Sequence, residues 1–458
     1  MKSYLVAALG LGASLASQAK PAPEYRPYTA AQTQAEARLW DNPTWHTPYR
    51  PQLSNEEKIA GLSRFWSEAK FNFPFFDKVP HLAWDSLYVA YLPKVQAAPT
   101  TLAYYQLLQE MCAQLRDGHT NVYPPKELFG EVFERPPLRT ALIQDKVLIT
   151  EVNSETLRRR GIAPGQEVVA IDGTAVHDYA RPRLAWQSAS TPQDRLVRTY
   201  TYSLLAGPAQ QPVRLTLRDA RGRVAEQSVA RSGYADQAPA RPPLEFRVLE
   251  HNVGYLALNS FGDPAIKQLM ADVYPRLRQT RALIIDVRAN GGGNSDYGFD
   301  VLSYLTDQPI PTARWMTRDY HPTFRPWERP PQWYAEPVEP VPPKGANPYR
   351  GPVVLLTGAR TFSAAEDFAV AFELMQRGVI VGEPTGGSTG QPLSFSLPGG
   401  GSARICSKRD AYPDGQEFVG VGVQPQVLVH PTVQDVRRGR DTVLEAALKQ
   451  LKTSGKSG

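Results

Sequence analysis

Cysteine is scarce in this sequence: Cys112 and Cys406 are the only two among 458 residues. Two cysteines allow at most one disulfide and no cysteine-based zinc site, so we expect neither a metal centre nor a disulfide scaffold. Beyond the N-terminus there is no apolar run of roughly 18 residues, which excludes a transmembrane helix in the mature chain. No long block of lysines or arginines occurs, and the net charge is only +6, so we expect no nucleic-acid partner.

What the sequence does contain is the composition of a globular protein. Hydrophobic residues make up 42% and charged residues 21%, which excludes a disordered or fibrous chain. At roughly 150 residues per domain, the length indicates about three domains.

The first 19 residues have the pattern of an export signal. Lys2 supplies a positive charge, residues 5–16 are mostly apolar, and Ser17 and Ala19 are the small residues of a cleavage site. We predict cleavage after Ala19 and a periplasmic or secreted protein, although a short buried helix would explain the same apolar stretch. In an oxidising compartment the two cysteines could form a disulfide.

Shifts in residue pattern divide the remaining chain into four regions. Residues 20–53 are rich in Pro, Ala and Gln and predict an irregular lead-in. Residues 54–125 predict a small helical domain, because Ser54 and Glu57 form a capping-box pattern ahead of apolar residues at helical spacing. Residues 138–232 predict a mostly β module with short strands and glycine turns.

The last region, residues 244–452, alternates strands and helices and predicts an α/β domain in a multi-domain chain. The runs 282–287 and 353–357 are apolar almost throughout, as in parallel strands covered on both faces. A helix over 433–451 should close the chain. Residues 307–351 are rich in proline and aromatic residues, and we interpret them as a long loop that forms a lid or rim on the substrate side.

Ser363 stands where a buried strand is followed by a helix. Free amides and the positive end of the dipole at a helix N-terminus stabilise an anionic intermediate, so Ser363 is a candidate nucleophile. The plain alternative is that Ser363 and Glu366 only form a capping box, because serine is a common helix cap.

His119 follows Asp117 and Gly118 in a turn just past a predicted helix. We expect it to be exposed there and to serve as a general base, because histidine titrates near neutral pH. An ordinary solvent-exposed loop histidine is the alternative. None of the other six histidines lies in a comparable turn.

Three glycines, Gly291 to Gly293, follow the strand over 282–287. Glycine lets backbone amides approach a ligand closely, so this loop is expected to supply an oxyanion donor, with Gly292 the first choice. The amide of Ala364, the residue after Ser363, is expected to supply the other. The alternative is that the glycines only end the strand.

A second serine, Ser388, lies in a Gly-x-Ser-x-Gly pattern, followed along the chain by Asp410 and His430. That order is typical of an esterase, but the nucleophile elbow requires a helix directly after the serine. Residues 391–397 contain a proline, and their apolar and polar side chains alternate as in a strand. We therefore consider the esterase the weaker hypothesis.

Together these motifs resemble the C-terminal processing peptidases, the serine peptidase family that includes the tricorn core protease. The shared order is Asp-Gly-His-Thr (117–120), Asp-x-Arg-x-Asn-Gly-Gly-Gly (286–293), Ser-Ala-Ala-Glu (363–366), Gly-Glu-Pro-Thr-Gly-Gly (382–387) and Gly-Val-x-Pro (422–425). The resemblance covers most of residues 54–450. It implies a PDZ domain over 138–232 and a crotonase- or ClpP-like peptidase core over 244–452.

The resemblance also implies roles for single residues. One branch of the family pairs its serine with a lysine, and here Ser388 holds the lysine position. The tricorn-like branch pairs its serine with the upstream histidine, which implies Ser363 as nucleophile and His119 as base. That branch has a serine before its histidine, where this chain has Gly118. The branch also has a glutamate that orients the histidine, and Glu417 is the acid nearest to that position in this chain.

The sequence therefore predicts an exported serine endopeptidase that cleaves unfolded or tail-presented polypeptides without a cofactor. We expect the PDZ-like module to bind extended peptides by strand addition, with a carboxylate nest at the Gly165 turn; a rigid spacer is the alternative. Two other functions remain open: a catalytically silent relative that only binds peptides, and an esterase built on Ser388.

Overall fold

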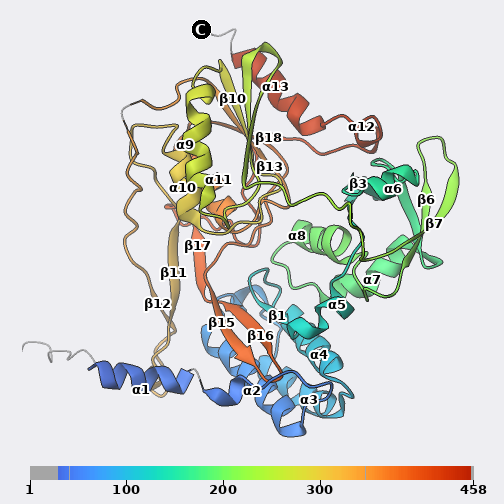
Figure 1. Ribbon diagram of the computed structural model, residues 1–458. Helices are drawn as coiled ribbons and strands as arrows, with labels where there is room; N and C mark the ends of the chain where they lie inside the picture. The colour runs from blue at the N-terminus through green and yellow to red at the C-terminus, as the bar shows by residue number, and fades with distance from the viewer. Residues whose placement is uncertain (1–28, 41, 346, 455–458) are drawn as a thin grey trace, which may run out of the picture. The chain divides into compact units, whose positions relative to one another are not determined.

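The computed structural model describes residues 29–40, 42–345 and 347–454 (Figure 1). By their internal contacts, the residues form two units, one ending at Thr44 and the other beginning at Trp45. The predicted export signal, residues 1–19, lies outside the described residues.

The first unit contains helix α1 (Ala30–Trp40). The prediction of an irregular lead-in is therefore wrong for these residues. The Thr29 amide donates to Gln32 Oε1 (2.9 Å), and the Gln32 amide donates to Thr29 Oγ1 (3.3 Å). This is a capping box, and alanine-rich sequence behind it favours a helix.

The second unit begins with the predicted helical domain. The Glu57 amide donates to Ser54 Oγ (3.2 Å) and the Ser54 amide to Glu57 Oε2 (2.9 Å), which confirms the capping box. Apolar residues such as Phe65 and Leu108 are fully buried between the helices. The short helix η1 (Pro43–Trp45) spans the boundary between the units. The elements that follow are α2 (Asn55–Asn72), η2 (Phe76–Lys78), α3 (Trp84–Ala97), α4 (Thr101–Ala113), β1 (Asn121–Tyr123), η3 (Lys126–Leu128) and α5 (Phe129–Val132).

The predicted β module is an antiparallel sheet with its own hydrophobic core. Its main strand order is β2-β3-β4-β6-β7, with β5 paired to β4, so β2 forms one edge. Ile149, Val168 and Leu215 are among its fully buried residues. The elements are β2 (Leu138–Ile143), β3 (Lys146–Val152), α6 (Glu155–Arg159), β4 (Glu167–Ile171), β5 (Thr174–Ala175), α7 (Val176–Trp186), α8 (Pro192–Leu196), the π-helical η4 (Val197–Ser203), β6 (Val213–Arg218) and β7 (Val224–Val229).

The α/β domain is built on a six-stranded sheet of order β18-β14-β13-β10-β9-β8, parallel except for β8. Alternate residues of β10 point to opposite faces. Leu283 and Ile285 pack in the cluster that includes α9, α10 and α11, whereas Ile284 packs against α13 (Figure 1). The elements are β8 (Leu244–Leu249), η5 (Glu250–Asn252), β9 (Val253–Leu258), α9 (Ala265–Leu277), β10 (Ala282–Asp286), α10 (Ser295–Leu302), β13 (Val353–Thr357), α11 (Ala364–Leu374), β14 (Gly378–Gly382), β18 (Val427–Leu428), α12 (Val433–Arg437) and α13 (Thr442–Ser454).

This sheet confirms the two predicted buried strands and fixes where the site must lie. β10 and β13 are adjacent and parallel, so the loops that follow them leave the same edge of the sheet. One loop carries the three glycines and the other leads to Ser363. Within the described residues, no helix is long and apolar enough to cross a membrane.

Two segments of this domain differ from what the sequence predicts. Residues 307–351, expected as a long loop, contain the strands β11 (Arg314–Asp319) and β12 (Gln332–Tyr334), which pair with each other and extend a sheet with β17 (Lys408–Ala411). The short helix η6 (Pro322–Phe324) lies between the two strands. The closing helix is interrupted at Gly439, whose φ of 67° is left-handed, so the chain turns there between α12 and α13.

A fourth sheet connects the helical domain to the C-terminal region. Its order is β1-β16-β15, with β16 (Gly401–Cys406) between β1 and β15 (Pro392–Leu397). Because β1 follows the turn that contains His119, this pairing brings the histidine beside the α/β domain. Cys112 and Cys406 are both buried free thiols, so no disulfide joins them.

Candidate active site

Ser363 lies at the N-terminus of α11, after the loop that follows β13. Its backbone has φ 57° and ψ −128°, a conformation that costs a non-glycine residue roughly 1–3 kcal/mol and persists only where the surroundings enforce it. The Ser363 amide donates to the Ser388 carbonyl (3.2 Å). The Ser363 hydroxyl lies 3.0 Å from His119 Nε2.

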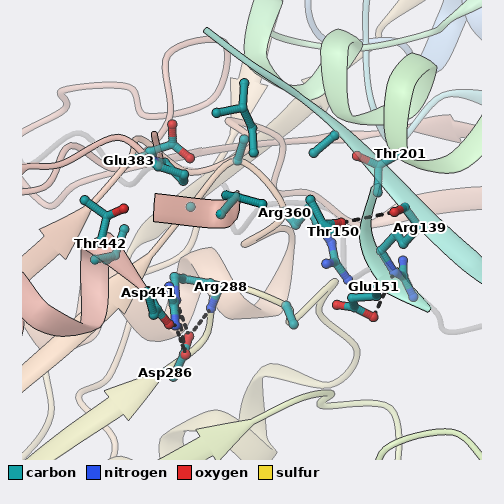
Figure 2. A pocket seen from close by; sticks show the side chains of 18 of the residues that line it. Arg139, Thr150, Glu151, Thr201, Asp286, Arg288, Arg360, Glu383, Asp441 and Thr442 are labelled. Carbon is teal, nitrogen blue, oxygen red and sulfur yellow. Dashed lines mark hydrogen bonds and ion pairs between the residues drawn. The ribbon is translucent and has the colours of Figure 1, made fainter. Parts of the chain in front are cut away.

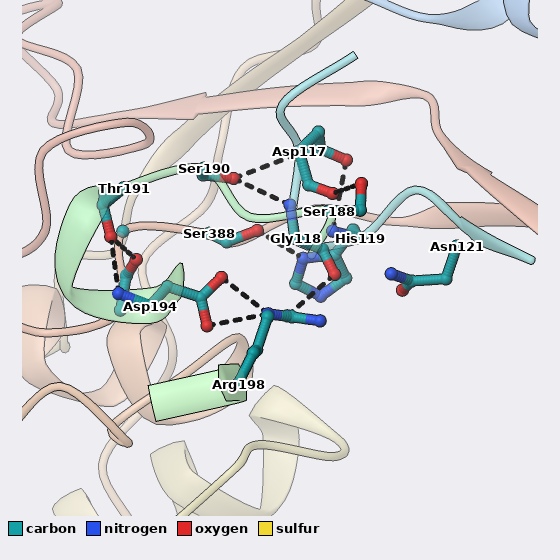
Figure 3. A network of polar contacts seen from close by, with 12 residues as sticks. Asp117, Gly118, His119, Asn121, Ser188, Ser190, Thr191, Asp194, Arg198 and Ser388 are labelled. Carbon is teal, nitrogen blue, oxygen red and sulfur yellow. Dashed lines mark hydrogen bonds and ion pairs between the residues drawn. The ribbon is translucent and has the colours of Figure 1, made fainter. Parts of the chain in front are cut away.

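His119 lies in the turn between α4 and β1 (Figure 3). The expectation that this histidine is exposed is wrong, because only 3% of its surface is accessible. Its amide donates to Asp117 Oδ2 (3.1 Å), and its ring stacks on Phe362 with the two ring centroids 4.8 Å apart. These contacts fix both the turn and the ring plane.

Burial is the main cause that lowers the pKa of His119 well below its usual value. The positive charges of Arg404, Arg198 and Lys408 lower that pKa further. The imidazole is therefore neutral near pH 7, which is the state that a general base requires.

Ser388 faces the other side of the same ring. Its Oγ lies 2.9 Å from His119 Nδ1 (Figure 3). The imidazole therefore bridges the hydroxyls of Ser363 and Ser388. Sequence reasoning identified Ser388 only as the substitute for a lysine or as an esterase nucleophile. Its contact with His119 joins residues 269 positions apart, and no local pattern marks it.

The esterase arrangement is not assembled. No helix follows Ser388; the next element is strand β15. Asp410 pairs with Lys408 (3.0 Å), and the exposed His430 pairs with Glu383 (2.8 Å).

Glu417, expected as the orienting acid, is occupied elsewhere. Its carboxylate forms ion pairs with Lys78 (3.1 Å) and Arg409. Within the described residues it makes no hydrogen bond to His119, and Ser388 lies at Nδ1 instead. Sequence alignment could not reveal this position, because one of the two cations that hold the carboxylate, Lys78, comes from a distant segment.

Gly118 has a steric reason. A Cβ built on it would lie 2.7 Å from Ser388 Oγ and 3.0 Å from Asp194 Oδ2. Any side chain at position 118 would therefore displace groups that surround the histidine.

The glycine loop lies against the nucleophile, as the strand order predicts. A Cβ built on Gly292 would lie 2.7 Å from Ser363 Cβ and 3.0 Å from the Ala364 nitrogen. The Gly292 amide, however, donates to Asn290 Oδ1 (2.9 Å). The Ala364 amide makes no hydrogen bond within the described residues.

The sequence profile of peptidase family S41 matches residues 252–429, which include Ser363, Ser388 and the glycine loop. This region belongs to peptidase family S41. Tricorn protease homolog 2 of Streptomyces coelicolor is 26% identical over 396 residues, which are 80% of this chain and 30% of that protein. The carboxyl-terminal-processing protease of Synechocystis is 22% identical over 365 residues, 76% of either chain.

The fold is also known from solved structures. Mature CPAF complexed with lactacystin matches with a TM-score of 0.66 at 16% identity, over 88% of this chain and 98% of that one. A peptidase from Parabacteroides merdae matches with a TM-score of 0.55 at 19% identity, over 89% and 99% of the two chains. These two structures show the fold, whereas the family match and the curated relatives support a serine peptidase.

In this chain, a segment of the β module holds the histidine turn (Figure 3). Ser190 Oγ donates to Asp117 Oδ1 (3.1 Å) and accepts from the Gly118 amide (2.9 Å). Arg198, paired with Asp194 at 2.9 Å, donates to the Gly118 carbonyl (3.0 Å). Sequence reasoning did not find these residues, since no motif marks them.

A cavity of about 1140 Å³ is lined by β2 of the β module and by the loops that follow β10 and β13 (Figure 2). Neither Ser363 nor His119 lines it. Arg288, in this cavity, is held by Asp286 (2.6 Å) and Asp441 (2.7 Å), so its charge is already balanced within the α/β domain.

The Gly165 turn does not form the expected open nest. Its amide donates to the Ile149 carbonyl (2.8 Å), and its carbonyl accepts from Arg437 Nε (3.4 Å). A Cβ at Gly165 would lie 2.9 Å from Arg437 Cα, so α12 covers the turn. β2, by contrast, forms an edge of its sheet and lines the cavity.

Proposed function

We propose that this chain is an exported serine endopeptidase with Ser363 as nucleophile and His119 as general base. The observation that carries the proposal is the 3.0 Å separation of Ser363 Oγ and His119 Nε2 at a strained helix N-terminus. Family S41 membership supports the reaction class. The proposal of export depends on the sequence pattern of residues 1–19.

The first step is attack by Ser363 Oγ on a peptide carbonyl carbon while His119 Nε2 takes the hydroxyl proton. His119 then gives this proton to the leaving amine, so the peptide bond breaks and an acyl ester on Ser363 remains. A water molecule, deprotonated by the same nitrogen, hydrolyses the ester and restores both side chains.

Ser388 is proposed to orient the base. Nε2 can accept a proton only if the ring proton is on Nδ1, and Nδ1–H can then donate to Ser388 Oγ at 2.9 Å. A serine at this place fixes the tautomer as a carboxylate would, but it adds no negative charge to stabilise the imidazolium. The low pKa of His119 is consistent with this difference.

The Ala364 amide is proposed as one oxyanion donor, since it follows the nucleophile and is free of other acceptors in the described residues. The glycine loop is proposed to supply the second. Gly292 can do so only by sharing or releasing Asn290 Oδ1, to which its amide now donates.

Polypeptides are the proposed substrates, because peptidases of this family act on them. The PDZ-like module is proposed to hold an extended segment along β2, beside the cavity that reaches the loops of the S41 domain. Unfolded or tail-presented chains fit this arrangement best, since a folded segment cannot pair with a strand edge.

A fluorophosphonate probe tests the nucleophile directly, with the labelled residue mapped by mass spectrometry. We expect the label on Ser363, no label in Ser363→Ala, and strongly slowed labelling and peptide cleavage in His119→Ala. The matched control is His81→Ala, which removes an exposed histidine outside the site and the cavity and should leave both rates unchanged.

Two outcomes would favour the alternatives. A label on Ser388 that survives in Ser363→Ala would support the esterase. No label and no cleavage by a folded wild-type chain that still binds unfolded polypeptide would support a catalytically silent peptide-binding protein.

A further inference from the structure

Glu366 holds a buried carboxylate in the first turn of α11, and its side chain has no exposed surface. Its two oxygens accept hydrogen bonds from three backbone amides and from the hydroxyl of a threonine. The donors are the Ser363 amide (3.1 Å), the Gly387 amide (2.7 Å), the Ser388 amide (2.9 Å) and Thr385 Oγ1 (2.6 Å). Thr389 Oγ1 lies 3.4 Å from Glu366 Oε2 and is a weaker fifth donor.

No cation balances this charge. Within the described residues, no lysine, arginine or histidine forms an ion pair with Glu366. Burying an unpaired carboxylate is unfavourable in free energy, and here only hydrogen bonds replace the water that the carboxylate loses. A helix cap alone does not need this arrangement, because an exposed side chain stabilises a helix start equally well.

The amides that Glu366 holds belong to both serines that contact His119. Ser363 Oγ lies 3.0 Å from His119 Nε2, and Ser388 Oγ lies 2.9 Å from His119 Nδ1. Glu366 Oε2 accepts from the amides of both, at 3.1 Å and 2.9 Å. One carboxylate oxygen therefore fixes the spacing between the two hydroxyls across the imidazole, and it supports the unfavourable φ of Ser363.

We propose that ionised Glu366 is a positioning residue, which aligns Ser363, His119 and Ser388 for proton transfer. This inference rests on the proposed function of Ser363 and His119. Glu366 touches no reacting atom; it acts through the backbone of the two serines.

The ionised state is required by the number of donors. Each oxygen accepts from at least two donors, whereas a protonated oxygen must itself donate and would lose one of these contacts. Burial raises the pKa of Glu366 to about 7, although the four hydrogen bonds oppose the shift. Two titratable groups face Glu366 from the elements packed against α11. One is Tyr412, after β17, whose pKa is raised mainly by burial and also by the Glu366 charge. The other is His119, which Ser388 connects to Glu366.

The pH dependence follows from the two opposite shifts. As the pH falls through about 7, Glu366 takes up a proton and the alignment is lost. His119, whose pKa is lowered, takes up its proton only at lower pH. The acid limb of kcat is therefore expected near pH 7 and belongs to Glu366.

The test is Glu366→Gln, which keeps the shape but replaces one accepting oxygen by a donating amide. We expect kcat for peptide cleavage to fall about 10- to 100-fold, as for a lost charge-assisted hydrogen bond, with little change in KM. The acid limb should move from about pH 7 to the lower pH at which His119 titrates. Glu373→Gln, in the same helix and bonded to Tyr412 and Gln426, is the matched control and should keep the wild-type profile.

A second variant covers the case that Glu366→Gln does not fold, as judged by circular dichroism. Thr385→Val removes one donor to the carboxylate, so the pKa of Glu366 should rise further and the acid limb should move above pH 7. Unchanged kcat and an unchanged limb in folded Glu366→Gln, or no upward shift in Thr385→Val, would overturn the inference. Full activity of Ser363→Ala would instead overturn the proposed function.

Discussion

Replacing Gly292 by alanine tests whether catalysis depends on the geometry of the oxyanion loop, as distinct from how well a glycine-rich turn tolerates an added Cβ. Gly292 has φ 96°, where alanine costs roughly 1–2 kcal/mol. Its new Cβ would also lie 2.7 Å from the Phe362 carbonyl oxygen and from Ser363 Cβ, and overpacking of this kind typically costs about 1–3 kcal/mol. Neither neighbour is the end of a flexible side chain, so the loop must move away from Ser363.

That movement is expected to remove one oxyanion donor, which lowers kcat about 100- to 1000-fold. Gly291→Ala is the matched control. A Cβ at Gly291 has no heavy atom within 4 Å, and its φ is not left-handed, so kcat should stay within about twofold. Both variants are to be compared by steady-state peptide cleavage and thermal unfolding. Equal kcat in the two folded variants would refute the assignment of this loop to the oxyanion site.

Two further substitutions test the surroundings of the histidine. Ser388→Ala leaves His119 Nδ1 without its hydroxyl partner, which costs about 1–3 kcal/mol for a buried group and should lower kcat about 5- to 150-fold. Ser303→Ala, which changes another buried serine, is the control and should leave kcat unchanged. An unchanged kcat in Ser388→Ala would contradict the orienting role of Ser388. Gly118→Ala places a Cβ 2.7 Å from Ser388 Oγ, so kcat should fall at least about tenfold and the melting temperature should drop, whereas wild-type kinetics and stability would show that the contact is relieved without cost.

Local patterns predicted the parts of the fold that depend on neighbouring residues. The Ser54 capping box and the apolar strands of β10 and β13 follow from spacing and composition alone, and the structure has them. The break at Gly439 and the strands within 307–351 were missed. A left-handed glycine interrupts an otherwise helical pattern, and short strands with exposed residues become strands only because a partner such as β17 pairs with them.

The sequence by itself determined which chemistry this protein can carry: a serine at a helix start, a histidine in a turn and a glycine loop after a buried strand. Parallel pairing of β10 and β13 then made the approach of the glycine loop to Ser363 foreseeable. Only the tertiary structure decided what surrounds the histidine. The histidine is buried and contacts Ser388, while Glu417 forms ion pairs elsewhere. These contacts join segments far apart in the chain. Long-range packing and charge bring such segments together, and no local pattern encodes them.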